Sequence, residues 1–238
     1  MTGLAPRLHS FAQIAKAAYQ EDAAPFHSLG LERARLVSRQ GAQCWVLENS
    51  TQLVFAFRGT EFDQSSDIKA SLKIALRPAM TRRHEGNAAA RAAYACGRVH
   101  RGFARELSKI HHSETLKLPP ENARQVYFCG HSMGGAMALL AAGRWRINYQ
   151  PEAVISFGAP CLGDAAFVSG LPVRHWRVVH GADCVPHLPF WLLGYRHHSA
   201  AIHIGQNGWP RGMFGDHRTK SYSAALAKYL ENGAAGEN

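Results

Sequence analysis

Apolar and polar positions along the chain repeat at two spacings, one typical of amphipathic helices and one typical of strands. Near the start, three- and four-residue intervals predict a helix over residues 8–19, with Ser10 as a candidate cap. Two β runs follow, residues 34–40 together with 44–49, and then 52–59, separated by the turn residues Asn49, Ser50 and Thr51. The first quarter of the chain is therefore predicted to be one helix followed by β structure.

Strands and helices alternate through the rest of the chain. A helix is predicted to start near Gly102, and a buried strand at 126–129 leads directly into a second helix. Further strands are predicted at 153–160, 173–180 and 198–205, before a final helix at 221–230. This alternation predicts an α/β fold built as one domain over residues 1–238.

Two segments stand apart from this alternation. A lid or cover is expected within residues 61–98. Inside this segment, the alternation over 71–76 favours a strand, although a basic amphipathic helix also fits the pattern. The small and polar residues 232–238 are expected to form a flexible tail.

Length and composition limit the class of protein. The chain has 238 residues, of which 46% are hydrophobic, so it can bury a substantial core. No terminal segment has the pattern of a secretory leader, and no run approaches the length of a transmembrane segment. Five cysteines form an odd set without C-x-x-C spacing, which favours a reducing compartment. We therefore expect a cytoplasmic protein, or one exported without a cleaved leader.

The charge balance is strongly basic. The chain carries 27 Lys and Arg against 17 Asp and Glu, a formal net charge of +10. A field of that sign would draw the protein toward an anionic membrane surface or another polyanion. The basic residues are scattered, without the aromatic-interleaved stripe typical of single-strand binding, so no specific nucleic-acid partner is expected.

The strongest chemical signal is a G-x-S-x-G pentapeptide that runs from Gly130 through Ser132 to Gly134. In this motif a strand turns sharply into a helix and lifts one serine hydroxyl clear of the sheet. The glycines are needed because the turn forces unfavourable backbone angles and leaves no room for a β-carbon. An apolar strand precedes the motif and an Ala- and Leu-rich helix follows it, so the context fits a hydrolase nucleophile at Ser132.

A serine nucleophile needs a histidine to accept its proton and a carboxylate to orient that histidine. In an elbow fold the acid and then the base follow the serine along the chain. Asp164 and Asp183 both follow predicted strands, and Asp183 is preferred because it lies in a glycine turn directly after its strand. His217 lies after the last strand and just before the last helix, where the base belongs, and His198 is the reserve.

The oxyanion that forms during acyl transfer needs fixed backbone donors. One is expected to be the amide of Met133, directly after the nucleophile, and the second to come from Thr60 at the end of an earlier strand. Substrate contacts are expected from the apolar loop after the acid and from the residue before the nucleophile, although core packing would also explain the loop. These residues are Leu188, Phe190, Trp191 and His131.

With these residues placed, the chain resembles the class 3 lipases, the fungal triacylglycerol lipase-like family of α/β hydrolases. The resemblance is carried by six segments in the family's order and by Asp216-His217 before the final helix. The segments are FAFRGT, VHRGF, CGHSMGGAMA, SFGAPCLGD, VVHGADCVPHLP and GYRHHSAAIHIG. The resemblance implies an α/β-hydrolase fold with a mostly parallel central sheet flanked by helices, and no cofactor.

By the same resemblance, Ser132, Asp183 and His217 are the triad, Thr60 and Met133 are the oxyanion donors, and Asp164 belongs to a structural turn. The chain departs from the family in one place, since residues 61–80 lack the tryptophan that members often carry in the lid.

We therefore expect a serine hydrolase that cleaves carboxylic esters of acyl lipids, such as acylglycerols, through an acyl-enzyme. The alternatives are a phospholipase acting on anionic membranes and a non-catalytic lipase-like module that binds membrane or polyanion. No metal is expected, because neither H-E-x-x-H nor a Cys/His ligand spacing is present.

Overall fold

One central sheet organises the computed structural model, which describes residues 4–59, 80–81, 97–111, 124–145, 150–188, 191–206 and 215–235. Its strands lie in the order β1-β2-β3-β6-β7-β8-β9. Their bounds are β1 Arg33–Arg39, β2 Ala42–Glu48, β3 Gln52–Phe57, β6 Gln125–His131, β7 Ala153–Phe157, β8 His175–His180 and β9 Ala201–Ile204. The first three strands pair antiparallel, and every pair from β3 to β9 is parallel. The predicted mostly parallel sheet is confirmed.

Strand β6 lies in the middle of this sheet and is buried on both faces. Val126 and Phe128 belong to the apolar cluster on one side, whereas Tyr127 and Cys129 belong to the cluster on the other. A strand covered on both faces needs apolar side chains at consecutive positions, which explains the continuous apolar run before the pentapeptide. The carboxyl end of β6 is therefore held firmly by two cores.

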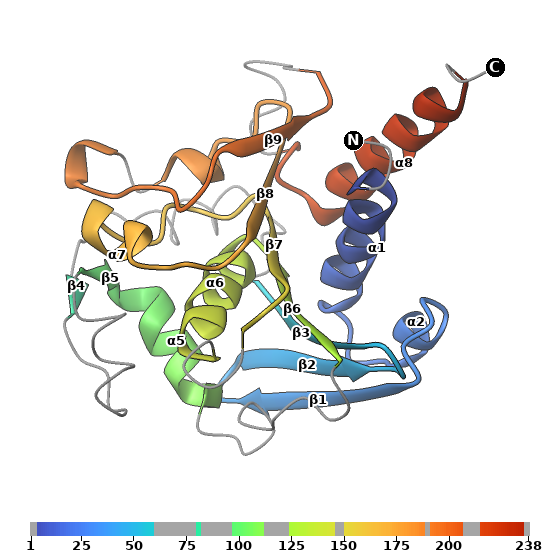
Figure 1. Cartoon of the computed structure of the whole chain (residues 1–238), viewed down its shortest axis with the longest axis horizontal. Helices are drawn as coiled ribbons and strands as arrows, with labels where there is room; N and C mark the ends of the chain where they lie inside the picture. Colours follow the sequence, from blue (N-terminus) through green and yellow to red (C-terminus); the bar gives the residue numbers. More distant parts are fainter. Residues whose placement is uncertain are drawn as a thin grey trace.

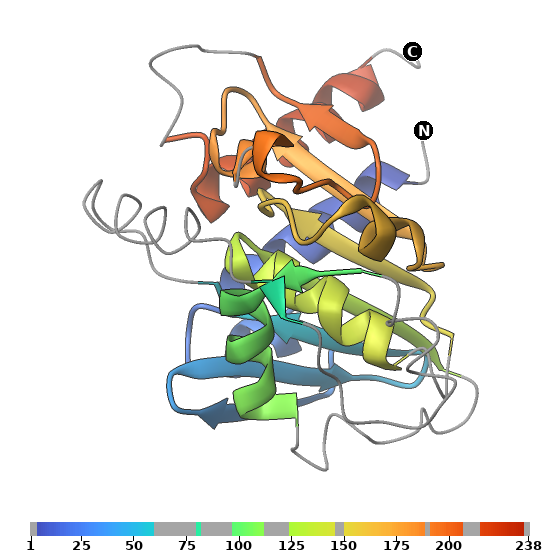
Figure 2. The same ribbon diagram turned by 90° about the vertical axis from the view of Figure 1, so that its left-hand side faces the viewer.

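Helices cover both faces of the sheet (Figures 1 and 2). Helices α5 (Arg101–His111), α6 (Met133–Trp145) and α7 (Ala165–Ser169) pack on one face, and α1 (Leu4–Ala17) and α8 (Thr219–Ala235) lie side by side on the other. Helix α6 passes across β3, β6 and β7, so the segment after the pentapeptide lies against the centre of the sheet. The smaller elements are α2 (Ala24–His27), β4 (Met80–Thr81), β5 (Val99–His100), η3 (Val185–His187) and η4 (Trp191–Leu193).

Three local predictions at the N-terminal end and the C-terminus need correction. The first helix begins at Leu4, and Ser10 lies inside it, where its hydroxyl donates to the carbonyl of Pro6 at 3.2 Å instead of capping the helix. The run at 34–49 is two strands, because Gln40 and Gly41 both have positive φ and form a tight hairpin turn. Helix α8 continues to Ala235, beyond its predicted end at 230 and into the segment predicted as a tail from 232.

The strand predicted at 71–76 lies outside the described residues, as does most of the predicted cover at 61–98. Among the helices that the structure describes, none combines the length and apolar character needed to cross a bilayer.

Candidate active site

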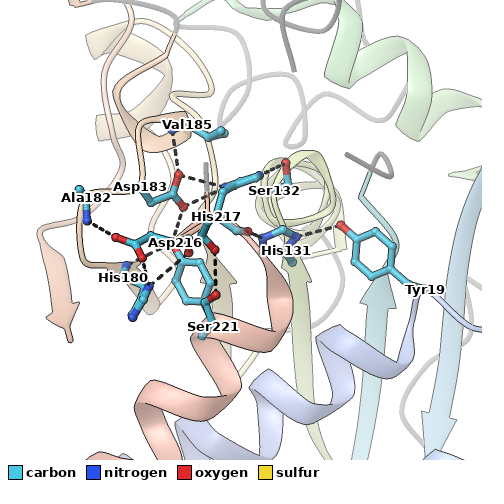
Figure 3. A network of polar contacts seen from close by, with 12 residues as sticks. Tyr19, His131, Ser132, His180, Ala182, Asp183, Val185, Asp216, His217 and Ser221 are labelled. Carbon is cyan, nitrogen blue, oxygen red and sulfur yellow. Dashed lines mark hydrogen bonds and ion pairs between the residues drawn. The ribbon is translucent and has the colours of Figure 1, made fainter. Parts of the chain in front are cut away.

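The turn between β6 and α6 places Ser132 at the carboxyl edge of the sheet (Figure 3). Ser132 has φ +56°, a left-handed conformation that costs a non-glycine residue about 1–3 kcal/mol. A β-carbon on Gly130 would lie 2.8 Å from the amide nitrogen of Gly135, and one on Gly134 would lie 2.9 Å from the carbonyl carbon of Arg58. The two glycines therefore let the start of α6 pack directly against the ends of β6 and β3.

Three polar side chains from distant parts of the chain meet at this edge. The Nε2 atom of His217 lies 3.0 Å from Oγ of Ser132, and Nδ1 lies 2.8 Å and 3.0 Å from the two carboxylate oxygens of Asp183. All three side chains are at most 2% exposed. Because a carboxylate can only accept from Nδ1–H, Nε2 of a neutral His217 carries the lone pair and accepts from the serine hydroxyl. Such a chain can remove the serine proton as the oxygen attacks.

The buried carboxylate of Asp183 has partners besides His217. The hydroxyl of Tyr222 donates to Oδ2 at 2.6 Å, and the backbone N–H of Val185 donates to Oδ1 at 2.9 Å. Burial, and then the neighbouring carboxylate, raise the pKa of Tyr222 well above its ordinary value, so its phenol keeps its proton and remains a donor. A β-carbon on Gly158 would lie 2.7 Å from Oδ2 of Asp183, so this glycine leaves the space that the site needs.

The loop that carries His217 is also tied to the loop that carries Asp183. Oδ2 of Asp216 accepts from the backbone N–H of Ala182 at 2.8 Å, and Oδ1 lies 3.6 Å from Nδ1 of His180 (Figure 3). The residues next to His217 and Asp183 are therefore joined directly. Sequence reasoning used Asp216 only in the family resemblance and did not consider Tyr222, because only the folded chain brings these residues to Asp183 and its loop.

His131, one of the expected substrate contacts, makes its hydrogen bonds inside the protein. Its side chain is buried, with Nε2 at 2.5 Å from the backbone carbonyl oxygen of His217 and Nδ1 at 2.8 Å from the hydroxyl of Tyr19. Both ring nitrogens are thus used inside the protein. Burial, and then the nearby His217, lower the pKa of His131 well below its ordinary value, so the ring is neutral.

The other predicted contacts are described in part. Leu188 is buried, and its carbonyl accepts from the backbone N–H of Cys161 at 2.7 Å. Met133 begins α6 and packs against the apolar core on that face of the sheet. Thr60, Phe190 and the side chain of Trp191 lie outside the described residues.

The reserve acid and base are occupied elsewhere. Asp164 caps α7, accepting from the backbone N–H of Phe167 at 2.9 Å, as expected of a structural turn. Nε2 of His198 donates to the backbone carbonyl oxygen of Leu171 at 2.6 Å. Neither side chain belongs to the hydrogen-bonded series of Ser132, His217 and Asp183.

A second serine and histidine pair shows which features set Ser132 apart. Oγ of Ser156 lies 2.8 Å from Nε2 of His175, a closer approach than that of Ser132 to His217. However, Ser156 lies inside strand β7, and the other nitrogen of His175 faces the hydroxyl of Ser199 rather than a carboxylate. Without a strained turn and an acid, proximity alone does not make a nucleophile.

Within the described ranges, no three His, Cys, Asp or Glu side chains come together as ligands for a metal ion.

Comparison with known proteins gives both a family and a fold. The family model described as "Lipase (class 3)" matches residues 54–193, which include Ser132 and Asp183. The chain is 34% identical over 113 residues to a secreted mono- and diacylglycerol lipase of Fusarium solani, covering 44% of this chain and 33% of that protein. It is 33% identical over 98 residues to the toxin TseL of Vibrio cholerae, covering 40% of this chain and 15% of the toxin. The chain thus spans a third or less of these relatives.

Among solved structures, a deletion mutant of the Rhizomucor miehei lipase propeptide complex superposes with a TM-score of 0.69 at 19% identity. That match covers 87% of this chain and 69% of the other. A lipase from Rhizopus microsporus var. chinensis gives a TM-score of 0.65 at 20% identity, over 88% of this chain and 77% of the other. These likenesses identify the α/β-hydrolase fold, as predicted.

Acid should destabilise the protein, because one buried and two half-buried imidazoles are held in their neutral form. Burial lowers the pKa of His131 and His175 well below 6.5, and that of His197 to about 4. In the unfolded chain these groups bind protons near pH 6.5, so stability is fully present above that pH and falls as the pH drops toward the folded values. From pH 7 to 5.5 we expect a loss of roughly 1 kcal/mol per group, measured by urea unfolding.

His197→Gln should remove about a third of that loss, since one of the three groups is gone. His203→Gln, at an exposed position on β9, is the matched control and should leave the pH dependence unchanged. Equal pH dependence in wild type and His197→Gln would contradict the assignment.

Proposed function

The chain belongs to the class 3 lipase family, and we propose that it is a serine hydrolase that cleaves carboxylic esters of acyl lipids through an acyl-enzyme. The observation that carries the proposal is the hydrogen-bonded series from Oγ of Ser132 through His217 to Asp183, with the serine on a strained turn. The fold and the family membership support the same chemistry. The chain spans a third or less of the relatives named above, so the substrate class is part of the proposal and is not taken from them.

In the first half of the reaction, Oγ of Ser132 attacks the ester carbonyl carbon while Nε2 of His217 takes the hydroxyl proton. Asp183 stabilises the imidazolium that forms, and His217 then gives the proton to the departing alcohol oxygen as the ester bond breaks. In the second half, water attacks the acyl carbon, His217 takes a proton from it, and that proton returns to Ser132 as the fatty acid leaves.

The developing oxyanion is proposed to be stabilised by the backbone N–H groups of Met133 and Thr60. Met133 is the first residue of α6, so its amide belongs to the helix terminus whose partial positive charge favours an anion. A β-carbon on Gly59 would lie 3.3 Å from Cβ of Ser132, so the residue before Thr60 lies against the nucleophile. That close approach supports Thr60 as the second donor.

A lipid substrate is supported by an exposed apolar turn and by the charge of the chain. In η4, which follows the acid loop, Leu192 is 76% exposed and Leu193 is 40% exposed. With a net charge of +10, these side chains would suit a lipid surface that carries anionic headgroups. We therefore propose acylglycerols as the first substrate class and phospholipids as the second, with contact at an anionic membrane surface.

Ser132→Ala should reduce turnover of p-nitrophenyl esters by about 10⁶-fold and abolish covalent labelling by a fluorophosphonate, because the oxygen proposed to form the acyl-enzyme is gone. Ser156→Ala is the matched control, since it also removes a serine that lies within hydrogen-bond distance of a histidine, and it should retain both. Labelling that persists in Ser132→Ala would overturn the proposed nucleophile. A wild-type protein that binds anionic vesicles but neither labels nor hydrolyses esters would instead support the non-catalytic alternative.

Asp183→Asn should lower kcat by about 10⁴-fold with the fold retained, because the amide no longer holds His217 in the tautomer that accepts the serine proton. Steady-state kinetics and circular dichroism measure the two effects. Asp164→Asn, which alters only the cap of α7, should change kcat less than twofold. Similar kinetic losses in both variants would remove Asp183 from the mechanism.

The double variant Leu192→Ser, Leu193→Ser should bind anionic vesicles about tenfold more weakly and hydrolyse emulsified triacylglycerol correspondingly slowly, because less apolar surface enters the lipid. Hydrolysis of a soluble short-chain ester should stay unchanged. Tyr229→Ser, at a 47% exposed site on α8, serves as the control. If the double variant matches Tyr229→Ser on vesicles, the surface contact lies elsewhere.

A further inference from the structure

A second hydrogen-bonded series reaches His217 from the side opposite Asp183. The hydroxyl of Tyr19, which follows α1, lies 2.8 Å from Nδ1 of His131, and Nε2 of His131 lies 2.5 Å from the backbone carbonyl oxygen of His217 (Figure 3). The rings of His131 and His217 are also in contact, with centroids 4.6 Å apart. No step of the proposed ester cleavage uses these two residues.

The chemistry of the groups fixes the direction of each hydrogen bond. A carbonyl oxygen can only accept, so Nε2 of His131 carries the hydrogen and donates it to His217. Nδ1 of the neutral ring is then an acceptor, and the phenol of Tyr19 must be the donor. The other tautomer would turn the Nε2 lone pair toward the carbonyl oxygen and lose that bond. Tyr19 therefore selects the tautomer of His131 that can hold the backbone of His217.

Tyr19 is itself held in place from the neighbouring strands. The guanidinium of Arg58 lies 5.8 Å from the centre of its ring, and Nη1 of Arg58 donates to Oε1 of Gln43. The next residue, Gln20, accepts at its carbonyl from Nε1 of Trp45 at 3.1 Å. The segment after α1 is thus fixed against β2 and the end of β3. These contacts place the hydroxyl of Tyr19 at the edge of the sheet where Ser132 lies.

We propose that Tyr19 and His131 are positioning residues that fix the backbone of His217, so that its ring stays aligned between Asp183 and Ser132. This inference rests on the proposed ester hydrolysis. Asp183 and Ser132 contact the ring at Nδ1 and Nε2, but neither bond holds the backbone of His217. A second bond at the carbonyl of the same residue fixes the backbone from which the ring projects. A displacement of about 1 Å at a reacting group can cost about 100-fold in rate, so the second bond is kinetically important.

The absence of charge on His131 is part of the same role. During proton transfer His217 becomes an imidazolium, and a positive His131 ring at 4.6 Å would oppose that charge. Burial keeps His131 uncharged, so the residue can stabilise the position of His217 without competing for the serine proton.

The test compares variants that remove one or both hydrogen bonds of this series. Tyr19→Phe removes only the hydroxyl, and Tyr127→Phe is its matched control, because it removes a tyrosine hydroxyl that donates to Gln125 at 2.9 Å. His131→Leu removes the donor to His217, whereas His131→Gln replaces it with an amide N–H of similar reach. For each we would measure kcat and KM on a p-nitrophenyl ester, the rate of fluorophosphonate labelling, and the urea midpoint.

We expect His131→Leu to lower kcat and the labelling rate by about 100-fold, and His131→Gln to recover at least tenfold of that loss, with KM within twofold of wild type. Tyr19→Phe should lower kcat about three- to tenfold, and Tyr127→Phe should not. In a His131→Leu background, Tyr19→Phe should have no further effect, because the two residues act through one series of bonds.

The inference is overturned if Tyr19→Phe matches Tyr127→Phe in kcat, if His131→Gln is as slow as His131→Leu, or if the losses in rate follow the losses in urea midpoint. A failure of the proposed function looks different, since wild type would then neither hydrolyse the ester nor label at Ser132.

Discussion

The left-handed turn at Ser132 is the constraint on which the rest of the site depends. It requires glycine on both sides, because the start of α6 approaches the ends of β3 and β6 too closely for a β-carbon. It also requires a rigid base, which β6 provides with an apolar core on each face. This packing offsets the backbone strain of about 1–3 kcal/mol at Ser132, and the fixed backbone determines the position of the serine hydroxyl.

Around that turn, polar groups are buried only where each has a partner. The side chain of Asp183, at 1% exposure, accepts from an imidazole, a phenol and a backbone amide, so both of its oxygens have donors. His131 is buried without charge between a donor and an acceptor. His217 is thereby held through its side chain on one side and its backbone on the other, while neighbouring loops are joined through Asp216. Such a site is organised before any substrate arrives.

Much of the fold could be predicted because its signals are local. Apolar runs, helical spacing and the pentapeptide gave the strands from β6 onward, helix α6 and the candidate nucleophile. The predictions failed where the signal was weak or depended on packing. The hairpin at Gln40 and Gly41 lacks the asparagine or aspartate that commonly marks such a turn, and α8 continued through residues whose composition resembles a tail. The two hydrogen bonds of His131 could not be predicted, because their partners lie far away along the chain.

By itself, the sequence determined the class of fold, the turn at Ser132, and the order of acid and base along the chain, because these follow from residue type and short-range spacing. Only the tertiary structure decided which histidine contacts the serine and which carboxylate contacts that histidine. It excluded Asp164 and His198 by giving them other hydrogen-bond partners, and it brought Tyr19, Tyr222 and Asp216 to the site. The physical reason is that hydrogen bonds act over about 3 Å, and contacts at that distance between residues separated by as many as 112 positions exist only once the sheet has assembled.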